Sequence, residues 1–422
     1  MDPARTILVR CSGRDRPGIT TGLLGVLAAA GAELYDLQQV VVRERLTLDL
    51  LVGLGDGDQA LKELLFHAWE NELQLDFEVV EADDDPEPGP RSVVTVIGSS
   101  LPPSALAAVT GAIADGGGNI DRIHRLSRVP VVSFEFVTVG GNIDAMRSQL
   151  VAASQRHGVD VAIQRETLER RAKRLVVLDV DSTLIQDEVI ELLADHAGCR
   201  QQISEVTTRA MAGEIDFEQA LRERVAQLAG TPASVLDEVG RTVRLTAGAR
   251  TFVRTLKRLG YTVAIVSGGF TAVTDRLAAD LGIDHAVANE LEIVDGVITG
   301  RLVGEVVDRP GKAAVLRRIA AAEQVPLEQT VAIGDGANDL DMLATAGLGI
   351  AFNAKAVVRE RADTAVSVPY LDAILFLLGI RREEVEAADA ADAAADAAAD
   401  AAADPHDGER VAAVPGDAAR RA

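Results

Sequence analysis

The sequence predicts an α/β protein in which a doubly wound parallel sheet with a helical cap follows two smaller, ferredoxin-like α+β domains. Three observations lead to this prediction. The order βαββαβ occurs twice in residues 1–168, and residues 173–382 then alternate apolar runs with helical stretches. A long helical stretch also separates the first two of those runs. A chain of 422 residues has room for several domains, since about 150 residues per domain is common.

Residues 1–85 carry the signals of the first ferredoxin-like domain. Its expected elements are strand 6–11, helix 18–30, strands 33–42 and 46–54, helix 58–71 and strand 73–80. An acidic linker with prolines, residues 83–91, leads to the second domain, residues 90–168. Its expected elements are strand 93–97, helix 103–115, strands 120–127 and 131–139, helix 143–157 and strand 159–164.

Continuous apolar runs in residues 173–382 predict a parallel sheet that helices cover on both faces. The runs are residues 175–178, 262–266, 330–333 and 348–351. Residues 186–246 are mainly helical and too long for a simple crossover, so we expect an inserted cap there. Residues 291–303 contain Asp295-Gly296 between β-rich flanks, which predicts a hairpin.

The composition excludes several classes of protein. With 48% hydrophobic and 25% charged residues, the balance is that of a soluble globular chain. The net charge of −23 argues against a nucleic-acid partner, which needs clustered Lys and Arg. No apolar run approaches the ~18 residues of a membrane helix, and a signal peptide is not recognisable. Cys11 and Cys199 form no disulfide or metal pattern, so we expect a cytoplasmic protein.

The chain ends in an Ala- and Asp-rich segment, residues 383–422. It offers nothing larger than Ala for packing over most of its length, so we expect a mostly disordered or fraying, solvated tail. The rest of the chain is acidic as well, and an anionic surface repels a phosphate at long range. Any phosphate site must therefore gather positive charge locally.

Asp179 and Asp181 are the strongest chemical signal. They directly follow strand 175–178, and ligands bind at the carboxyl ends of strands in open α/β sheets. Two carboxylates this close are costly without a cation, so they favour a hard metal such as Mg²⁺. A turn or a helix cap explains Asp and Ser here equally well, and the pair alone does not decide between these readings.

Further polar motifs follow the later strands. Residues 267–269, Ser-Gly-Gly, come after strand 262–266 and are suited to holding phosphate oxygens. Residues 334–339, Gly-Asp-Gly-Ala-Asn-Asp, bring a third group of oxygen ligands to the same edge. Lys312 begins another helical stretch and supplies the local cation. Each motif alone is common in turns or on surfaces, but their order at successive strand ends indicates a phosphate site.

Residues 173–382 resemble the haloacid-dehalogenase (HAD) superfamily, and within it the phosphoserine phosphatases, because all four superfamily motifs are present. The resemblance implies hydrolysis of O-phospho-L-serine to L-serine and phosphate through an aspartyl-phosphate, the last step of serine biosynthesis. Asp179 is then the nucleophile and Asp181 the general acid and base. The implied phosphate-binding residues are Ser267, Gly268, Lys312 and Asn338. The implied ligands of Mg²⁺ are Asp179, the backbone of Asp181, and Asp335.

The substrate's serine part calls for further groups. Phosphoserine carries an ammonium and a carboxylate, so a selective pocket needs one acid and one fork-shaped cation. Glu188 and Arg224 can fill these roles, and their positions match the phosphoserine phosphatase pattern, in which Met211 and Phe217 cover the pocket. As isolated residues, Glu188 and Arg224 are more commonly explained by a solvated helix face. Met211 and Phe217 are more commonly explained by ordinary core packing.

The two ferredoxin-like units resemble ACT domains, which commonly bind amino acids at the interface of paired domains. Residues 13–18, Gly-Arg-Asp-Arg-Pro-Gly, match the family's loop and expose backbone N–H groups at a helix start. We therefore expect serine or another amino acid to bind near Asp15 and Gly18 as a regulator. Residues 98–103 lack this pattern. The two domains could instead serve only to build a dimer, and a homodimer is expected.

Two other functions remain open. The first is the same chemistry on another phosphorylated metabolite or on a phosphoprotein. The second is an amino-acid sensor with an inactive phosphatase domain, against which the intact Asp179, Asp181, Lys312 and Asp335 weigh.

Overall fold

A computed structural model describes residues 5–55, 57–80 and 89–403 of the chain. The chain folds into two compact units, Met1–Pro88 and Gly89–Ala422. Most of the expected linker, residues 83–91, lies outside the described residues. Among the helices described, none combines the length and the apolar character needed to cross a membrane.

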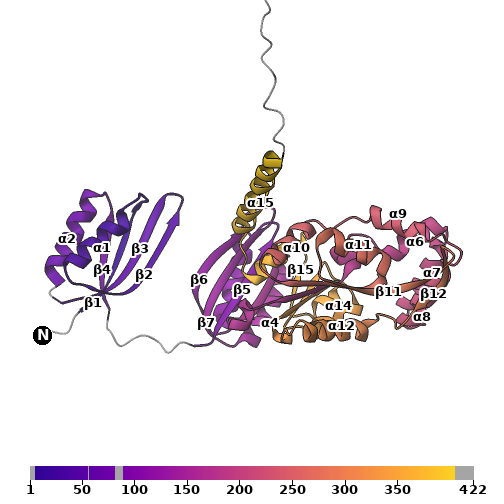
Figure 1. The fold of residues 1–422 in the computed structure, drawn as a ribbon. Coiled ribbons are helices and arrows are strands. Elements are labelled where there is room, and N and C mark those ends of the chain that lie inside the picture. The colour runs from indigo at the N-terminus through magenta and orange to yellow at the C-terminus, as the bar shows by residue number, and fades with distance from the viewer. Residues whose placement is uncertain (1–4, 56, 81–88, 404–422) are drawn as a thin grey trace, which may run out of the picture. The chain divides into compact units, whose positions relative to one another are not determined.

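The first unit is a four-stranded antiparallel sheet with two helices (Figure 1). Its strand order is β2-β3-β1-β4, which confirms the expected βαββαβ domain. One apolar cluster joins the two helices to the sheet. Its elements are β1 (Arg5–Arg14), α1 (Ile19–Ala29), β2 (Glu33–Val42), β3 (Arg45–Leu54), α2 (Gly57–Glu70) and β4 (Gln74–Val80).

The second ferredoxin-like domain repeats this topology with the strand order β6-β7-β5-β8. Both sheets thus place the first and third strands of the motif centrally, as a split βαβ unit does. Its elements are β5 (Arg91–Gly98), α3 (Pro103–Asp115), β6 (Gly118–Ser127), β7 (Val132–Gly140), α4 (Ile143–His157) and β8 (Asp160–Arg165).

This second domain packs directly on the larger α/β domain. Ile97, Leu126 and Ala162 belong to the same apolar cluster as the short helix η4 (Leu371–Leu378). Polar contacts border that cluster, among them the buried Arg170–Glu135 ion pair of 2.5 Å. The sequence predicted two separate domains, whereas the structure joins them through a shared core within one unit.

A seven-stranded sheet organises the α/β domain, with the order β12-β11-β10-β9-β13-β14-β15. All neighbouring strands are parallel except β11 and β12, which form the predicted hairpin around Asp295 and Gly296. Both turn residues have positive φ, as a tight hairpin turn requires. The strands are β9 (Leu175–Leu178), β10 (Thr262–Phe270), β11 (His285–Val294), β12 (Val297–Val303), β13 (Thr330–Gly334), β14 (Leu348–Phe352) and β15 (Thr364–Val366).

Helices cover both faces of this sheet, as the continuous apolar strands predicted (Figure 1). In β9, Val176 and Leu178 contribute to the cluster on one face, and Leu175 and Val177 to the cluster on the other. The helices around the sheet are α5 (Leu168–Arg171), α10 (Ala249–Arg258), α11 (Thr271–Leu281), α12 (Arg309–Ala322), α13 (Leu340–Thr345) and α14 (Ala356–Arg359).

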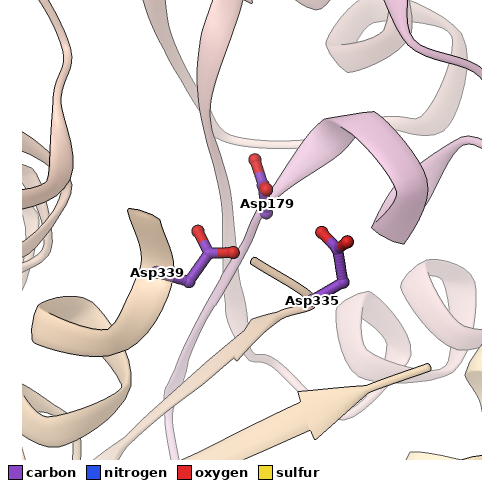
Figure 2. A group of neighbouring side chains, drawn as sticks. All are labelled: Asp179, Asp335 and Asp339. Carbon is purple, nitrogen blue, oxygen red and sulfur yellow. The ribbon is translucent and has the colours of Figure 1, made fainter. Parts of the chain in front are cut away.

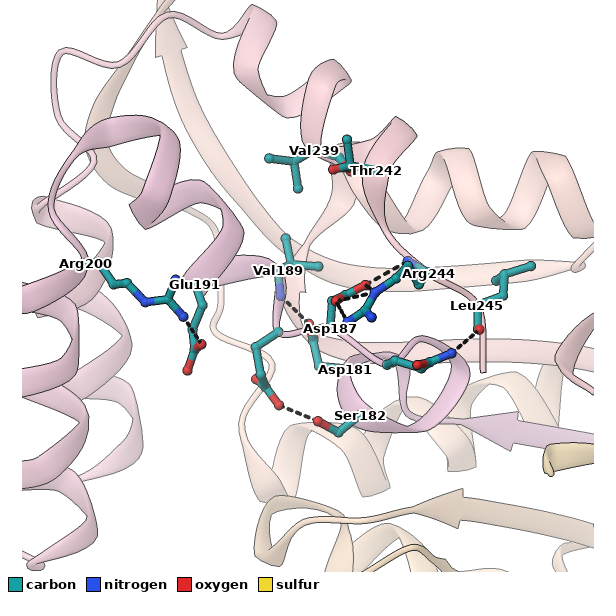
Figure 3. Close-up of polar contacts among 12 residues, drawn as sticks. Asp181, Ser182, Asp187, Val189, Glu191, Arg200, Val239, Thr242, Arg244 and Leu245 are labelled. Atoms are coloured by element: carbon teal, nitrogen blue, oxygen red, sulfur yellow. Dashed lines mark hydrogen bonds and ion pairs between the residues drawn. The ribbon is translucent and has the colours of Figure 1, made fainter. Parts of the chain in front are cut away.

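The expected cap is present as four helices: α6 (Val189–Ala197), α7 (Arg200–Met211), α8 (Phe217–Ala226) and α9 (Ser234–Thr242). The two chain segments that enter and leave it lie against each other, since Ile185 and Leu245 form an isolated β-bridge. Arg244 also makes a two-pronged ion pair with Asp187, at 2.6 Å for the shorter contact (Figure 3).

The acidic C-terminal segment departs from its expected disorder up to residue 403. Residues 382–403 form helix α15 (Arg382–Ala403) instead. Its Asp389 pairs with Arg254 at 2.5 Å and also with Arg258. Arg382 at its start pairs with the buried Asp372 at 2.5 Å. Arginines of α10 hold this helix by charge, which the scarcity of large apolar residues in the segment does not predict. Residues 404–422 of the predicted tail lie outside the described residues.

Candidate active site

The polar motifs meet at the carboxyl edge of the parallel sheet. Leu178 is in register with Ile265 on one side and with Ile333 on the other. The residues that follow these three positions therefore emerge side by side, and the backbone N–H of Asp179 donates to the carbonyl of Ile333 at 2.9 Å. The sequence predicted this convergence.

Three carboxylates form a compact cluster there (Figure 2). Asp179, Asp335 and Asp339 each offer an oxygen, and these oxygens lie within 4.8 Å of one another. Asp179 and Asp339 are almost fully buried, with exposed fractions of 3% and 0%. Oxygen ligands at this spacing suit a hard divalent cation.

Lys312 lies inside this cluster with no exposed surface. Its Nζ is 2.7 Å from Oδ1 of Asp179 and 2.7 Å from Oδ1 of Asp339. Burial alone lowers the pKa of this lysine, but the two carboxylates together outweigh that effect and raise the pKa above its usual value. Lys312 is therefore a permanent cation at the strand ends, as the sequence analysis required of a phosphate site.

One lysine does not neutralise three acids. Burial, and then the charge of Asp339, raises the pKa of Asp179 well above its usual value despite Lys312. Burial and the charges of Asp339 and Glu188 raise the pKa of Asp335 to about 7. When all three acids are ionised, the cluster carries more negative charge than Lys312 balances, and a divalent cation would balance it.

Asp339, the last residue of the Gly-Asp-Gly-Ala-Asn-Asp motif, joins this cluster although it is not among the predicted site residues. Besides holding Lys312, its Oδ2 accepts a hydrogen bond of 3.0 Å from the backbone of Gly336. A Cβ at Gly334 would lie 2.4 Å from Cγ of Asp339, so only glycine fits there. The sequence signal that could have indicated Asp339 is its position four residues after Asp335 in the same motif. Asn338, half-buried, folds over Gly336 in the same turn.

The carboxylate of Asp181 points away from the three-acid cluster. Its Oδ1 accepts from the backbone N–H of Val189 at 2.8 Å (Figure 3). Its Oδ2 accepts from the Ser267 hydroxyl at 2.9 Å. Burial raises the pKa of the Asp181 carboxyl although these hydrogen bonds oppose the shift. The two neighbouring aspartates thus face different partners and are equipped for different tasks.

The Ser-Gly-Gly loop closes against Asp181. The Ser267 hydroxyl accepts from the N–H of Gly269 at 2.7 Å, and a Cβ at Gly269 would come within 3.1 Å of Asp181 Oδ2. At Gly268 a Cβ would lie 3.2 Å from the ring of Phe217. Glycine at both positions allows the backbone to approach Asp181 and the cap.

Glu188 and Arg224 both lie on the cap side of this edge. Glu188 is exposed at the start of α6 and accepts a hydrogen bond of 2.7 Å from the Ser182 hydroxyl. Surrounding protein, and then the charge of Asp181, raises the pKa of Glu188. Burial lowers the pKa of Arg224, against the attraction of Glu188 and Asp181. Glu188 and Arg224 therefore interact electrostatically with each other and with Asp181, although the two form no direct ion pair within the described residues.

The remaining predicted residues have different outcomes. Phe217, the first residue of α8, lies close to Gly268, and its role as a cover of the substrate stays a prediction. Met211 ends α7, and its side chain lies outside the described residues. Asp15 and Gly18 are exposed in the first ferredoxin-like domain, where Gly18 has a φ of 97° at the start of α1.

A contact between the cap exit and the catalytic loop had no sequence signal. The Thr246 hydroxyl donates to the carbonyl of Thr183 at 2.7 Å, and the Thr246 N–H donates to Leu184 at 3.0 Å. Thr183 in turn places its hydroxyl 3.5 Å from Asp335. The loop after Asp179 is thereby tied to the end of the cap.

A doubly wound sheet with a helical cap, paired aspartates after its central strand and a buried lysine define the class of HAD-like hydrolases. Sequence comparison agrees: residues 176–344 match the haloacid dehalogenase-like hydrolase family. Residues 5–78 and 91–164 match ACT domain families.

Relatives narrow the class further. The chain is 57% identical to a phosphoserine phosphatase of Streptomyces coelicolor, over 91% of this chain and 94% of that protein. It is 48% identical to the phosphoserine phosphatase SerB2 of Mycobacterium tuberculosis, over 92% and 97%. The crystal structure of a probable phosphoserine phosphatase from Vibrio cholerae aligns with a TM-score of 0.55 and 36% identity, covering 68% of this chain and 86% of that one. The chain belongs to the phosphoserine phosphatase family of HAD hydrolases, with two ACT domains.

Proposed function

We propose that this protein hydrolyses O-phospho-L-serine to L-serine and phosphate, the last step of serine biosynthesis, through an aspartyl-phosphate on Asp179. The observation that carries the proposal is the buried contact of Lys312 with Asp179 beside Asp335, in a chain 57% identical over 91% of its length to a phosphoserine phosphatase. A lysine and two carboxylates held there can bind and activate a phosphate ester.

Asp179 is suited to be the nucleophile. Its Oδ1 accepts from Lys312 and from the backbone N–H of Val180, both at 2.7 Å. Oδ2 is then the oxygen that attacks phosphorus, while Lys312, Ser267 and the N–H groups of the glycine loop hold the phosphoryl oxygens. Splitting the hydrolysis into two displacements lowers each barrier.

Asp181 is suited to move the proton. With its pKa raised by burial, it can give a proton to the serine oxygen as the ester bond breaks. It then takes a proton from the water that attacks the aspartyl-phosphate, which returns Asp179 as a carboxylate. The backbone N–H of Val189 holds the Asp181 carboxylate in place during both steps, and the Ser267 hydroxyl, which donates to Asp181 without substrate, turns to the phosphoryl group when substrate binds.

Mg²⁺ fits the acidic cluster. We propose that Asp179, the backbone of Asp181 and Asp335 hold it, and that Asp339 remains with Lys312. When bound, the ion neutralises charge on the phosphate and orients it for in-line attack. Burial, and then the charges of neighbouring acids, raise the pKa values of Asp179 and Asp335, and a divalent ion would favour their ionised forms.

Glu188 and Arg224 are proposed to select serine. A carboxylate and a guanidinium on the cap side offer partners for the substrate's ammonium and carboxylate, respectively. Phe217, with Met211 from the preceding helix, would cover the bound serine.

The first ACT domain is the proposed regulatory unit. Within the described part of the chain no side chain caps the N-terminus of α1 at Gly18, so its N–H groups can receive the carboxylate of serine or another amino acid. The test is a serine titration at fixed phosphoserine on wild type and on Asp15→Ala, with the exposed Asp76→Ala as control. Equal inhibition of all three proteins would place the effector site elsewhere.

A homodimer and a cytoplasmic location remain proposals. Every residue of the edge strand β2 is exposed, including Leu34, Val40 and Val42, which favours pairing with a second copy. Sedimentation of the intact chain decides the oligomeric state. Cys11 and Cys199, both buried thiols, fit a reducing compartment.

Phosphate release from phosphoserine, measured with Mg²⁺ and with a chelator, tests the main proposal. We expect activity only with the metal, and none in Asp179→Asn, which keeps the shape of the nucleophile but not its charge. A panel of phosphomonoesters and a phosphoprotein tests the alternative substrates. Activity on none of them would favour the sensor with an inactive phosphatase domain.

A further inference from the structure

A buried amide connects two parts of the active site that are far apart in the sequence. Asn289 lies on β11 with only 2% of its surface exposed. Its Nδ2 donates to the carbonyl of Gly268 at 2.9 Å, and its Oδ1 accepts from the backbone N–H of Val307 at 2.8 Å. Only one orientation of the amide satisfies both contacts, because one partner is an acceptor and the other a donor.

The first contact replaces a missing strand bond. The parallel ladder between β10 and β11 pairs Val266 with Val287 and resumes at Phe270 with Asn289. Residues 267–269 therefore bulge out of the strand opposite the single residue Ala288. The Asn289 side chain reaches into this bulge and holds the carbonyl of Gly268, next to Ser267.

The second contact holds the approach to Lys312. Val307 directly precedes Asp308, whose side chain caps α12 by accepting from Gly311 at 2.8 Å. Lys312 follows in the first turn of that helix, and its backbone N–H bonds to the carbonyl of Asp308 at 2.9 Å. The contact that holds the backbone of Val307 therefore also sets the position of the first turn of α12 and of the Lys312 backbone.

We propose that Asn289 is a positioning residue that sets the separation between the Ser267–Gly269 loop and the start of the Lys312 helix. The two segments approach closely, since a Cβ at Gly268 would lie 3.8 Å from the carbonyl oxygen of Val307. Both carry groups that hold the transferring phosphoryl, so their spacing affects the transition state more than the binding of the serine part. The inference rests on the phosphatase activity proposed above, though not on serine as the alcohol.

The test compares Asn289→Leu and Asn289→Asp with wild type. Leu keeps a similar volume without either hydrogen bond, whereas Asp can accept from Val307 but cannot donate to Gly268 when ionised. The control is Thr330→Val at the opposite, amino end of β13. Thr330 is equally buried and also bridges two backbone groups, donating to Leu327 at 2.7 Å and accepting from Gly347 at 3.3 Å.

The thermal midpoint is measured for each full-length protein. The kinetic constants kcat and KM are measured on phosphoserine and on p-nitrophenyl phosphate. For both Asn289 variants we expect kcat to fall roughly ten- to hundredfold on both esters, with KM within about threefold. Thr330→Val should lose a comparable amount of thermal stability while kcat stays within about twofold.

The role is overturned if Asn289→Leu keeps its kcat, or if Thr330→Val loses as much kcat at the same thermal midpoint. Full activity in Asn289→Asp would also overturn it, since the Gly268 contact would then be dispensable. Wild type that cleaves p-nitrophenyl phosphate but not phosphoserine would refute the proposed substrate alone. The role of Asn289 would still be measured on p-nitrophenyl phosphate. Wild type that cleaves neither ester would refute both the proposed substrate and the role of Asn289.

Discussion

Replacing Lys312 by Met tests the arrangement at the centre of the site. The ammonium is 2.7 Å from both Asp179 and Asp339, and all three side chains are at least 95% buried. Met has a similar shape but no charge, so the change leaves two acids buried without their common partner. We expect both stability and activity to fall, for separate reasons.

The stability loss follows from the unpaired charge. Removing one member of a buried ion pair costs about 3–5 kcal/mol, because the remaining charge stays desolvated. Without metal we expect a loss in this range, measured by urea unfolding in a chelator. Proton uptake by Asp179 should reduce the loss at acid pH, since burial already raises the pKa of Asp179.

The activity loss follows from the missing cation on the phosphoryl group. Preorganised cations and donors of this kind account for about a thousandfold or more of the rate, so kcat on phosphoserine should drop by that much. The double variant Lys312→Met with Asp339→Asn separates the two effects. Removing one positive and one negative charge should restore most of the stability but none of the activity.

Two results would refute this reasoning. A Lys312→Met protein that is as stable as wild type in the chelator would show that the contacts with Asp179 and Asp339 are energetically unimportant. A double variant with activity near wild type would show that the lysine serves only to neutralise Asp339.

Three further predictions concern the pocket, the metal and the fold. Arg224→Ala should raise KM for phosphoserine at least about tenfold while leaving p-nitrophenyl phosphate kinetics unchanged, because only the amino acid needs the guanidinium; equal effects on both esters would contradict the role. The pKa of the Asp335 carboxyl is raised from 3.8 to about 7 in the folded protein. Metal-free protein should therefore lose stability as the pH rises from about 4 to about 7, because in this range the carboxyl is ionised in the unfolded chain but still protonated in the folded one. Mg²⁺ must displace that proton, so its apparent affinity by calorimetry should weaken below pH 7, and a pH-independent affinity would speak against Asp335 as a ligand. Gly248→Ala should cost at least about 2 kcal/mol in urea unfolding, since φ is 78° and the new Cβ would lie 2.1 Å from Asp372 Oδ1, whereas Gly25→Ala, with open space, should not destabilise.

The elements and their order can be predicted from the amino-acid sequence. Alternating and continuous apolar patterns predicted the strands of both ferredoxin-like domains and of the parallel sheet, and the helical insertion predicted the cap. The site motifs were also readable, because the carboxyl ends of parallel strands must meet at one edge. Asp179 and Asp335 were therefore expected to lie together before their distance was known.

Which polar groups pair across long stretches of chain cannot be predicted in this way, because it depends on how the elements pack. Asp339 reaches Lys312, Asn289 links Gly268 to Val307, and Thr246 holds Thr183, and none of these contacts has a periodic signal. The docking of the second ferredoxin-like domain and of α15 depends likewise on surfaces that exist only after folding. Local patterns report on the burial of single elements, whereas these contacts depend on distances set when the elements pack together.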